Sequence, residues 1–224
     1  MITADYLAEI AVWAHELRPE EAERARRGIT ERSFAEGAYV FHRGDRFDSW
    51  LGVVDGLLKI GTVSSAGKDI SFAGIRTGGW FGEGTLIKNE TRRYDLVALR
   101  NSRLALMNKE TFSWLFNNSV AFNRFLVHQL NERLGQFIAL VEYDRMLDPP
   151  ARIARSIAWL FDPVLYPRAE TRLVISQEEI GRLSGLSRQA ANKALNELAA
   201  SGVLQLEHGV LTVIDIERLR HYGE

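Results

Sequence analysis

The sequence predicts an α+β fold in which a strand-rich N-terminal domain is joined by a long helix to a helical C-terminal domain. Three observations support this prediction. Short apolar or alternating segments, separated by glycine-containing turns, run from Ile29 to about Met107. Helical periodicity then continues from Lys109 to about Tyr143. The C-terminal part has the pattern of two short helices followed by a β-hairpin. We therefore divide the chain into residues 1–119, 120–147 and 148–224.

Length and composition limit the possible classes of protein. The chain has 224 residues, enough for two domains, and a formal net charge of −1, so a nucleic-acid partner would need a local basic patch. It contains no cysteine, which excludes disulfides, thiolate catalysis and cysteine-bound zinc or iron–sulfur clusters. No apolar run is long enough to span a bilayer, and the N-terminus lacks a basic secretory leader. We expect no metal, no membrane partner and a cytoplasmic location.

The N-terminal domain is predicted to begin with two helices and continue as a strand-rich barrel or jelly roll. Leu7, Ile10, Ala14 and Leu17 recur at helical spacing, and Pro19 suits the first turn of a second helix. The strands that follow are too closely spaced to leave room for the helices of a parallel α/β sheet. They are expected at 39–41, 50–54, 57–60, 69–72, 96–99 and 104–107, with turns at Gly37, Gly44–Asp45, Asp55–Gly56, Gly67–Lys68, Gly78–Gly79 and Gly82.

The long helix carries an apolar stripe wide enough for two partners. Its central residues step by three and four in alternation, as in a short coiled coil: Val127, Leu130, Leu134, Phe137 and Val141. Phe125, Leu126, Ile138 and Leu140 widen this stripe. We expect one side to pack on the N-terminal domain and the other on a second copy of the chain; an ordinary core helix is the alternative. Asp148 and Pro149 are expected to end it and start the next helix, from Ala151 to Phe161.

The C-terminal pattern predicts a winged helix-turn-helix. Ser176 and Glu179 form a capping-box pattern at the start of a short helix, and residues 184–186 make a turn around Gly185. Ser187 is the expected N-cap of a second helix, which continues to about Ala200 and ends before Gly202. Segments 203–206 and 210–213, joined at His208–Gly209, have the pattern of a hairpin wing.

The second of these helices has one apolar and one polar face. Ala191, Ala194, Leu195 and Leu198 lie at inward spacing. The opposite face has side chains that bind base edges and phosphates, and no acid. The predicted DNA-binding residues are Ser187, Arg188, Gln189, Asn192, Lys193, Asn196 and, in the wing, His208. The alternatives are a solvated helix face or a protein-interaction domain.

These motifs resemble the cyclic-AMP receptor protein and fumarate–nitrate regulator (Crp/Fnr) family over nearly the whole chain. Gly44–Asp45, Gly56, Gly67–Lys68 and Gly79–Glu83 look like turns of its β-roll, a double-stranded β-helix. The long helix resembles its dimer helix, and 175–195 its helix-turn-helix. The resemblance implies a transcription regulator that binds a twofold-symmetric DNA site as a homodimer, with RNA polymerase as a further partner of activators. Arg188, Gln189 and Lys193 correspond to the family's base-reading residues; Gln189 replaces an acid, so no operator sequence is carried over.

The resemblance also implies a ligand site in the β-roll. Gly82, Glu83 and Arg93 match the family's phosphate-binding loop, in which the arginine pairs with a cyclic phosphate and the glutamate accepts a ribose hydroxyl. Tyr94, however, replaces a small hydroxyl residue, and Phe137 and Ile138 replace hydroxyls that meet the base. Alternatively, Gly82 serves a turn and Glu83 pairs with Arg93. We expect that no cofactor is required, while a cyclic nucleotide, another small ligand or no ligand all remain open.

Other functions have weaker support. The sequence shows no phosphate-binding glycine loop with a lysine, no metal-binding histidine pair and no serine-nucleophile elbow, so we do not expect an enzyme. A haem sensor would need an axial ligand, and His15, His42 and His128 are isolated. A cyclic-nucleotide-binding module that acts on a partner protein would explain the β-roll. It would not explain the basic and amide side chains from Arg188 to Asn196.

Overall fold

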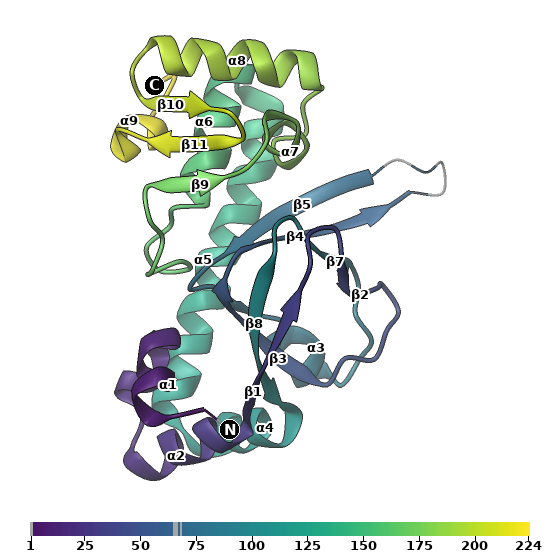
Figure 1. Cartoon of the computed structure of the whole chain (residues 1–224), viewed down its shortest axis with the longest axis vertical. Coiled ribbons are helices and arrows are strands. Elements are labelled where there is room, and N and C mark those ends of the chain that lie inside the picture. The colour runs from purple at the N-terminus through teal and green to yellow at the C-terminus, as the bar shows by residue number, and fades with distance from the viewer. Residues whose placement is uncertain (1, 65–66, 68) are drawn as a thin grey trace.

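The computed structural model describes residues 2–64, 67 and 69–224 and shows an elongated molecule built along one long helix, α5 (Figure 1). The N-terminal helices lie at one end of α5, a β-domain lies beside it, and the C-terminal head lies at the other end. Lys68, half of the predicted Gly67–Lys68 turn, is outside the described residues.

The N-terminal helices form as the sequence predicts. Thr3 caps α1 (Ala4–Ile10), a 3-10 helix η1 (Val12–Glu16) follows, and Pro19 begins α2 (Pro19–Gly28). Trp13 of η1 anchors them, because its ring centroid lies 5.3 Å from that of Trp50 in the β-domain and 5.4 Å from that of Phe122 in α5. Edge and tilted aromatic contacts of this kind stabilise packing beyond the effect of burial alone, so the N-terminal helices are part of the core of the N-terminal domain.

The β-domain is a roll of two four-stranded antiparallel sheets, which confirms the predicted fold class. One sheet has the order β1-β8-β3-β6 and the other β2-β7-β4-β5. Leu51, Val53, Leu58, Leu96 and Leu104 fill the space between the sheets. The strands are β1 (Ile29–Phe34), β2 (Tyr39–Phe41), β3 (Ser49–Asp55), β4 (Leu57–Val63), β5 (Asp69–Arg76), β6 (Trp80–Phe81), β7 (Asp95–Ala98) and β8 (Ser102–Asn108).

Helices α3 (Glu83–Lys88) and α4 (Lys109–Asn118) precede α5 (Val120–Met146). The two faces of α5 differ. Phe122, Leu126 and Gln129 are buried against the rest of the chain. The residues of the predicted seam are 42–65% exposed: Val127, Leu130, Leu134, Phe137 and Val141. Nowhere in the described chain is a helix both long and apolar enough to cross a membrane.

The head contains the predicted helices and hairpin. Asp148 caps α6 (Pro149–Trp159), which is followed by α7 (Gln177–Leu183) and α8 (Arg188–Ala200). Strands β10 (Leu204–Glu207) and β11 (Val210–Val213) form the wing. Two elements were not predicted: β9 (Arg172–Val174), which pairs with β11, and α9 (Ile216–Arg220).

A buried arginine joins the head to the β-roll. Arg76 of β5 donates hydrogen bonds to the backbone carbonyls of Leu160, Glu170 and Arg172, at 3.3, 3.0 and 3.4 Å. Burial lowers the pKa of Arg76 to about 10. In return, the Tyr166 hydroxyl of the head donates to the carbonyl of Gly74 in β5, at 2.9 Å. Because these hydrogen bonds cross the domain boundary, the head has a defined position on the roll.

Candidate nucleic-acid interface and ligand site

Two local motifs position the exposed helix of the head. Ser176 and Glu179 form both bonds of the predicted capping box, with Ser176 N–H donating to the Glu179 carboxylate at 2.7 Å and Glu179 N–H donating to Ser176 Oγ at 3.2 Å. Gly185 has φ +65°, and a Cβ there would lie 2.5 Å from a guanidinium nitrogen of Arg152, so the turn needs glycine. Ser187 Oγ then accepts from Ala190 N–H and starts α8.

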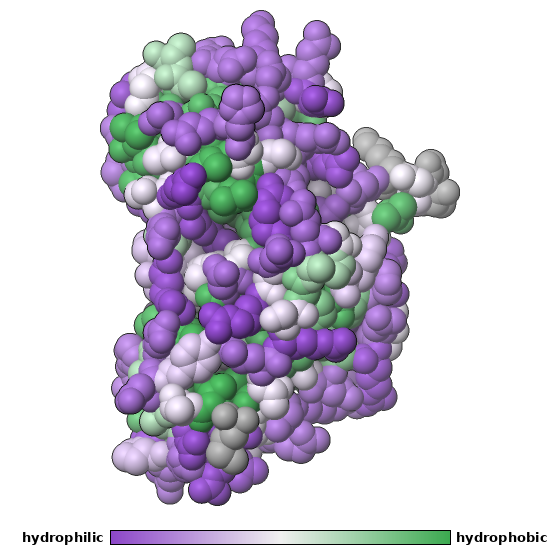
Figure 2. Space-filling model, in the orientation of Figure 1, coloured by the Kyte–Doolittle hydropathy of each residue, from purple (hydrophilic) through white to green (hydrophobic). Residues whose placement is uncertain are grey.

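The faces of α8 are as predicted. Ala191, Ala194, Leu195 and Leu198 are buried in the head core. The polar residues Arg188, Gln189, Asn192, Lys193 and Asn196 are all exposed. Helix α8 forms the outer edge of the head, away from the β-roll (Figure 1). Figure 2 shows hydrophilic side chains projecting from this end of the molecule.

Three side chains on this face have no partner among the residues that the structure describes. Within the described part of the chain, Arg188, Gln189 and Lys193 form no hydrogen bond or ion pair. Both charges and the amide are therefore available to another molecule. Arg188 and Gln189 lie in the first turn of α8, where a recognition helix concentrates its base contacts.

The two asparagines are organised differently. Asn192 donates a hydrogen bond to Gln177, the first residue of α7, and Asn196 donates to Asn192 at 3.2 Å. Gln177 was not predicted as a site residue. Its position directly after the N-cap Ser176 places it at the start of α7, where α7 contacts α8. His208 is exposed in the turn between β10 and β11, so it lies on the wing rather than on the α8 face.

The buried arginine of the expected phosphate-binding loop is Arg92, not Arg93. Arg92 is 1% exposed and donates to the carbonyls of Gly82, Phe47 and Ser49, at 2.9, 3.1 and 2.7 Å. Gly82 has φ +92°, and a Cβ there would lie 2.7 Å from Arg92 Nη1. Gly82 therefore serves both a left-handed turn and close packing of this guanidinium.

The alternative ion pair between Glu83 and Arg93 is wrong, because each residue has another partner. The Arg93 side chain is 72% exposed and pairs with Glu90 at 2.6 Å. The Glu83 carboxylate is 8% exposed and pairs with Arg133 of α5 at 3.1 Å. Arg133 also donates to the carbonyl of Trp80. Arg133 was not predicted, because its partner lies 50 residues away in the chain.

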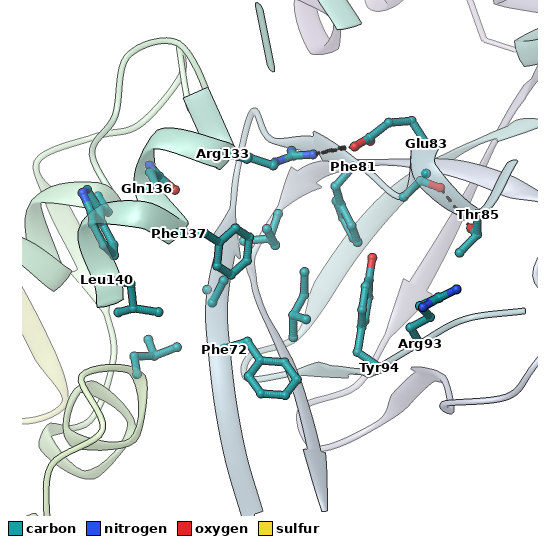
Figure 3. Close-up of a pocket in the computed structure, with 18 of the residues that line it drawn as sticks. Phe72, Phe81, Glu83, Thr85, Arg93, Tyr94, Arg133, Gln136, Phe137 and Leu140 are labelled. Carbon is teal, nitrogen blue, oxygen red and sulfur yellow. Dashed lines mark hydrogen bonds and ion pairs between the residues drawn. The ribbon is translucent and has the colours of Figure 1, made fainter. Parts of the chain in front are cut away.

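A cavity of about 350 Å³ lies between the β-roll, α5 and the head (Figure 3). Gly82, Glu83, Arg93 and Tyr94 all line it. The charged groups expected to contact a cyclic nucleotide have other partners in this structure, because the largely exposed Arg93 guanidinium pairs with Glu90 and the Glu83 carboxylate accepts from Arg133. Tyr94 fills space where the family has a small residue, and burial raises the pKa of its hydroxyl, which stays neutral.

A winged helix-turn-helix with an exposed polar face on its second helix, attached through a long helix to a β-roll, defines a class of transcription regulators. The cyclic nucleotide-binding domain matches residues 31–119, and the Crp-like helix-turn-helix domain matches residues 151–222. The chain belongs to the Crp/Fnr family of transcriptional regulators. Members of this family regulate transcription and are not enzymes, which confirms that expectation.

Relatives and solved structures agree with this assignment. The chain is 26% identical over 201 residues to the cyclic AMP receptor protein of Thermus thermophilus, covering 89% of this chain and 90% of the relative. It is 28% identical over 174 residues to the CRP-like protein Clp of Xanthomonas campestris, covering 74% and 75%.

The solved structure of the c-di-GMP responsive global regulator CLP of Xanthomonas campestris has a TM-score of 0.64 at 26% identity, covering 88% of this chain and 99% of that one. FixK2 of Bradyrhizobium japonicum shares the fold, with a TM-score of 0.71 at 18% identity and coverage of 86% and 96%.

Proposed function

We propose that the chain is a sequence-specific regulator of transcription that binds a twofold-symmetric site on double-stranded DNA as a homodimer. The observation that supports this most directly is the face of α8, where Arg188, Gln189 and Lys193 are exposed without partners among the described residues. Arginine can bind the edge of guanine and glutamine that of adenine, both in bidentate geometry, while lysine binds guanine or phosphate. Ser187, Asn192, Asn196 and His208 complete the proposed contact surface.

The proposed dimer interface is the exposed face of α5. Five large apolar side chains at coiled-coil spacing face solvent in the single chain, whereas Phe122, Leu126 and Gln129 of the same helix are buried against the rest of the chain. A second copy packed against the same face would remove them from water. Twofold symmetry would then provide two α8 helices for successive major grooves, about one DNA turn apart.

The proposal also defines the partners. Because the target is genomic DNA, we place the protein in the cytoplasm, without a membrane partner, and with RNA polymerase as a further contact where it activates. DNA binding requires no cofactor in this proposal. Cyclic AMP and cyclic GMP remain candidate effectors of the matched domain, and Gly82, Glu83, Arg93 and Tyr94 are the proposed effector residues. An effector acts only by binding one arrangement of the heads better than another.

Selection of bound duplexes from a random DNA pool tests this function. The full chain is used with no nucleotide, with cyclic AMP and with cyclic GMP. We expect an enriched inverted repeat, and its loss in the double variant Arg188→Ala/Lys193→Ala. Arg145→Ala is the matched control, because it removes an exposed cation at the end of α5 and should leave the selected sequence unchanged. No enrichment in any arm would contradict the proposed function, and enrichment of single half-sites would contradict its dimeric form.

A further inference from the structure

We infer that Gln177 and Asn196 fix the side-chain amide of Asn192, so that Asn192 selects adenine at one position in each half of the DNA site. This inference rests on the proposed function, since it names the base that one residue of the same interface recognises. Arg188 and Lys193 have no partner among the described residues, whereas the protein itself holds Asn192 in place.

The packing of α7 on α8 places Gln177 beside Asn192. Gly181 of α7 faces Ala191 of α8 so closely that a Cβ at Gly181 would lie 2.8 Å from the Cβ of Ala191. These two small residues therefore let the helices approach each other. Gln177 is the first residue of α7, where the capping box of Ser176 fixes the backbone. Its side chain consequently leaves the backbone at a defined point next to the polar face of α8.

The three amides form a chain of hydrogen bonds that runs in one direction. Asn196 Nδ2 donates to Asn192 Oδ1 at 3.2 Å, and Asn192 Nδ2 donates to Gln177 Oε1. Turning the Asn192 amide over would set its oxygen against Gln177 Oε1 and its nitrogen against Asn196 Nδ2, which breaks both bonds. The order of donor and acceptor on Asn192 is therefore fixed before DNA binds.

Asn192 keeps one donor and one acceptor for another molecule. A side-chain amide has two N–H donors and two oxygen lone pairs, and the chain of amides uses one of each. In the major groove, adenine presents an acceptor at N7 beside a donor at N6, which matches this pair in bidentate geometry. Guanine presents acceptors at both N7 and O6, so one of them would face the oxygen of Asn192. Adenine is therefore the purine that satisfies both remaining groups.

An amide that is fixed in advance is also more selective than a free one. A free asparagine loses rotamer freedom on binding, and it can turn to suit different base edges. Asn192 has already lost that freedom, and turning it would break its bonds to Gln177 and Asn196. It lies four residues after Arg188, so both side chains are on the same face of α8. Asn192 thus contacts the base, while Gln177 and Asn196 are positioning residues.

Competition binding of the full-length protein to variants of the selected duplex tests the base assignment. Each base pair of one half-site is replaced in turn. We expect one position at which adenine is preferred over guanine about tenfold or more. Asn192→Ala should reduce this preference to less than about twofold and leave the preferences at the other positions as they are.

Two substitutions of Gln177 separate positioning from a structural role. Gln177→Leu removes the acceptor and should reduce the adenine preference about threefold or more. Gln177→Glu keeps an oxygen acceptor, so the preference should stay near the wild-type value, although the added negative charge weakens binding to every duplex alike. Gln205→Leu makes the first exchange at an exposed position on the wing and should leave the adenine preference unchanged. A purely structural role would weaken binding to all duplexes equally in Gln177→Leu.

NMR relaxation of side-chain amides tests the fixed amide without DNA. Asn131 of α5 is the reference, because it is exposed and forms no hydrogen bond among the described residues. We expect an order parameter of about 0.8 for the Asn192 amide in the free protein, against less than about 0.6 for Asn131. In Gln177→Leu the value for Asn192 should fall toward that of Asn131.

Three results would overturn the inference: a selected site without an Asn192-dependent preference for adenine, a preference that Gln177→Leu leaves unchanged, or an Asn192 amide as mobile as that of Asn131. Any of them together with an enriched inverted repeat rejects only this inference. A duplex selection that enriches no sequence would reject the proposed function, and the adenine assignment with it.

Discussion

The guanidinium of Arg100 donates two hydrogen bonds, at 2.9 and 2.7 Å, to the carboxylate of Glu179. Arg100 belongs to the turn after β7 of the roll, whereas Glu179 is the capping-box residue of α7 in the head. The same carboxylate accepts from the backbone N–H of Ser176. The Glu179 side chain thus fixes the start of α7 and also connects the helix-turn-helix to the β-roll.

This relationship predicts a pH-dependent contribution to stability. Burial alone would raise the pKa of Glu179, but the hydrogen bonds from Arg100 and Ser176 outweigh it and the pKa is lowered. A lowered pKa in the folded state stabilises the fold above the unfolded value of about 4.3. That contribution is lost as the pH falls through the folded pKa.

We therefore expect Glu179→Gln to lower the free energy of unfolding at pH 7 by about 1–3 kcal/mol. Because glutamine can also form the capping box, the decrease in the free energy of unfolding measures the contribution of the ion pair between Arg100 and Glu179. In thermal unfolding from pH 7 to pH 3, the difference in stability between the variant and the wild type should disappear below about pH 4. Glu178→Gln, whose exposed carboxylate pairs with Arg182, is the control and should change little. A gap that is constant with pH would contradict the assignment.

Replacing the two adjacent arginines should have unequal effects on stability. Arg92→Met leaves the carbonyls of Gly82, Phe47 and Ser49 without their donor, and should cost about 3 kcal/mol or more in urea unfolding. Arg93→Met removes an exposed ion pair and should stay within about 0.5 kcal/mol of the wild type. Equal costs would mean that Arg92 is not the structural residue of this loop.

Arg188 and Lys193 should affect DNA binding in different ways. Arg188→Ala should cost about 1–3 kcal/mol of binding free energy and relax specificity at one base position. If Lys193 binds phosphate, Lys193→Ala should weaken all sequences alike and reduce the salt dependence of binding. Competition binding with single-base operator variants, repeated over a range of salt concentrations, separates the two. Uniform weakening by Arg188→Ala would remove it as a base-reading residue.

The proposed dimer interface on α5 predicts that a charged side chain introduced there will lower the mass of the protein in solution. Phe137 is half exposed on the seam of α5, and an aspartate there would place a charge inside the proposed interface. Phe137→Asp should halve the solution mass measured by light scattering. Asn131→Asp, on the same helix but outside the seam, should leave the mass unchanged. A wild-type chain that is itself monomeric would contradict the homodimer.

The features that sequence analysis predicted correctly depend on neighbouring residues. Asp148, Ser176 and Ser187 each cap a helix through a bond to an amide three residues later. The pattern that identifies such a cap is contained in four residues, so it can be read without knowing the fold. The buried face of α8 follows in the same way from helical periodicity.

The features that were missed depend on contacts between distant segments. Arg92 and Arg93 lie in an irregular loop, where no periodicity says which of two neighbours points inward. The pairing of Glu83 with Arg133 requires the roll to pack on α5 first. Strand β6 has only two residues, and β1 has a polar interior between buried ends, so neither produces an alternating pattern. In each case the tertiary packing, not the local sequence, decides the structure.

The position of Arg76 affects how the head can move. Its guanidinium is held by three carbonyls of the head and lies 4.5 Å from the ring centroid of Phe161. A small rotation of the head would break these bonds while the cation is still shielded from water, which is unfavourable. A large rotation would let water reach it. Intermediate rotation angles are therefore disfavoured. The head would exchange between discrete orientations instead of moving continuously from one to the other.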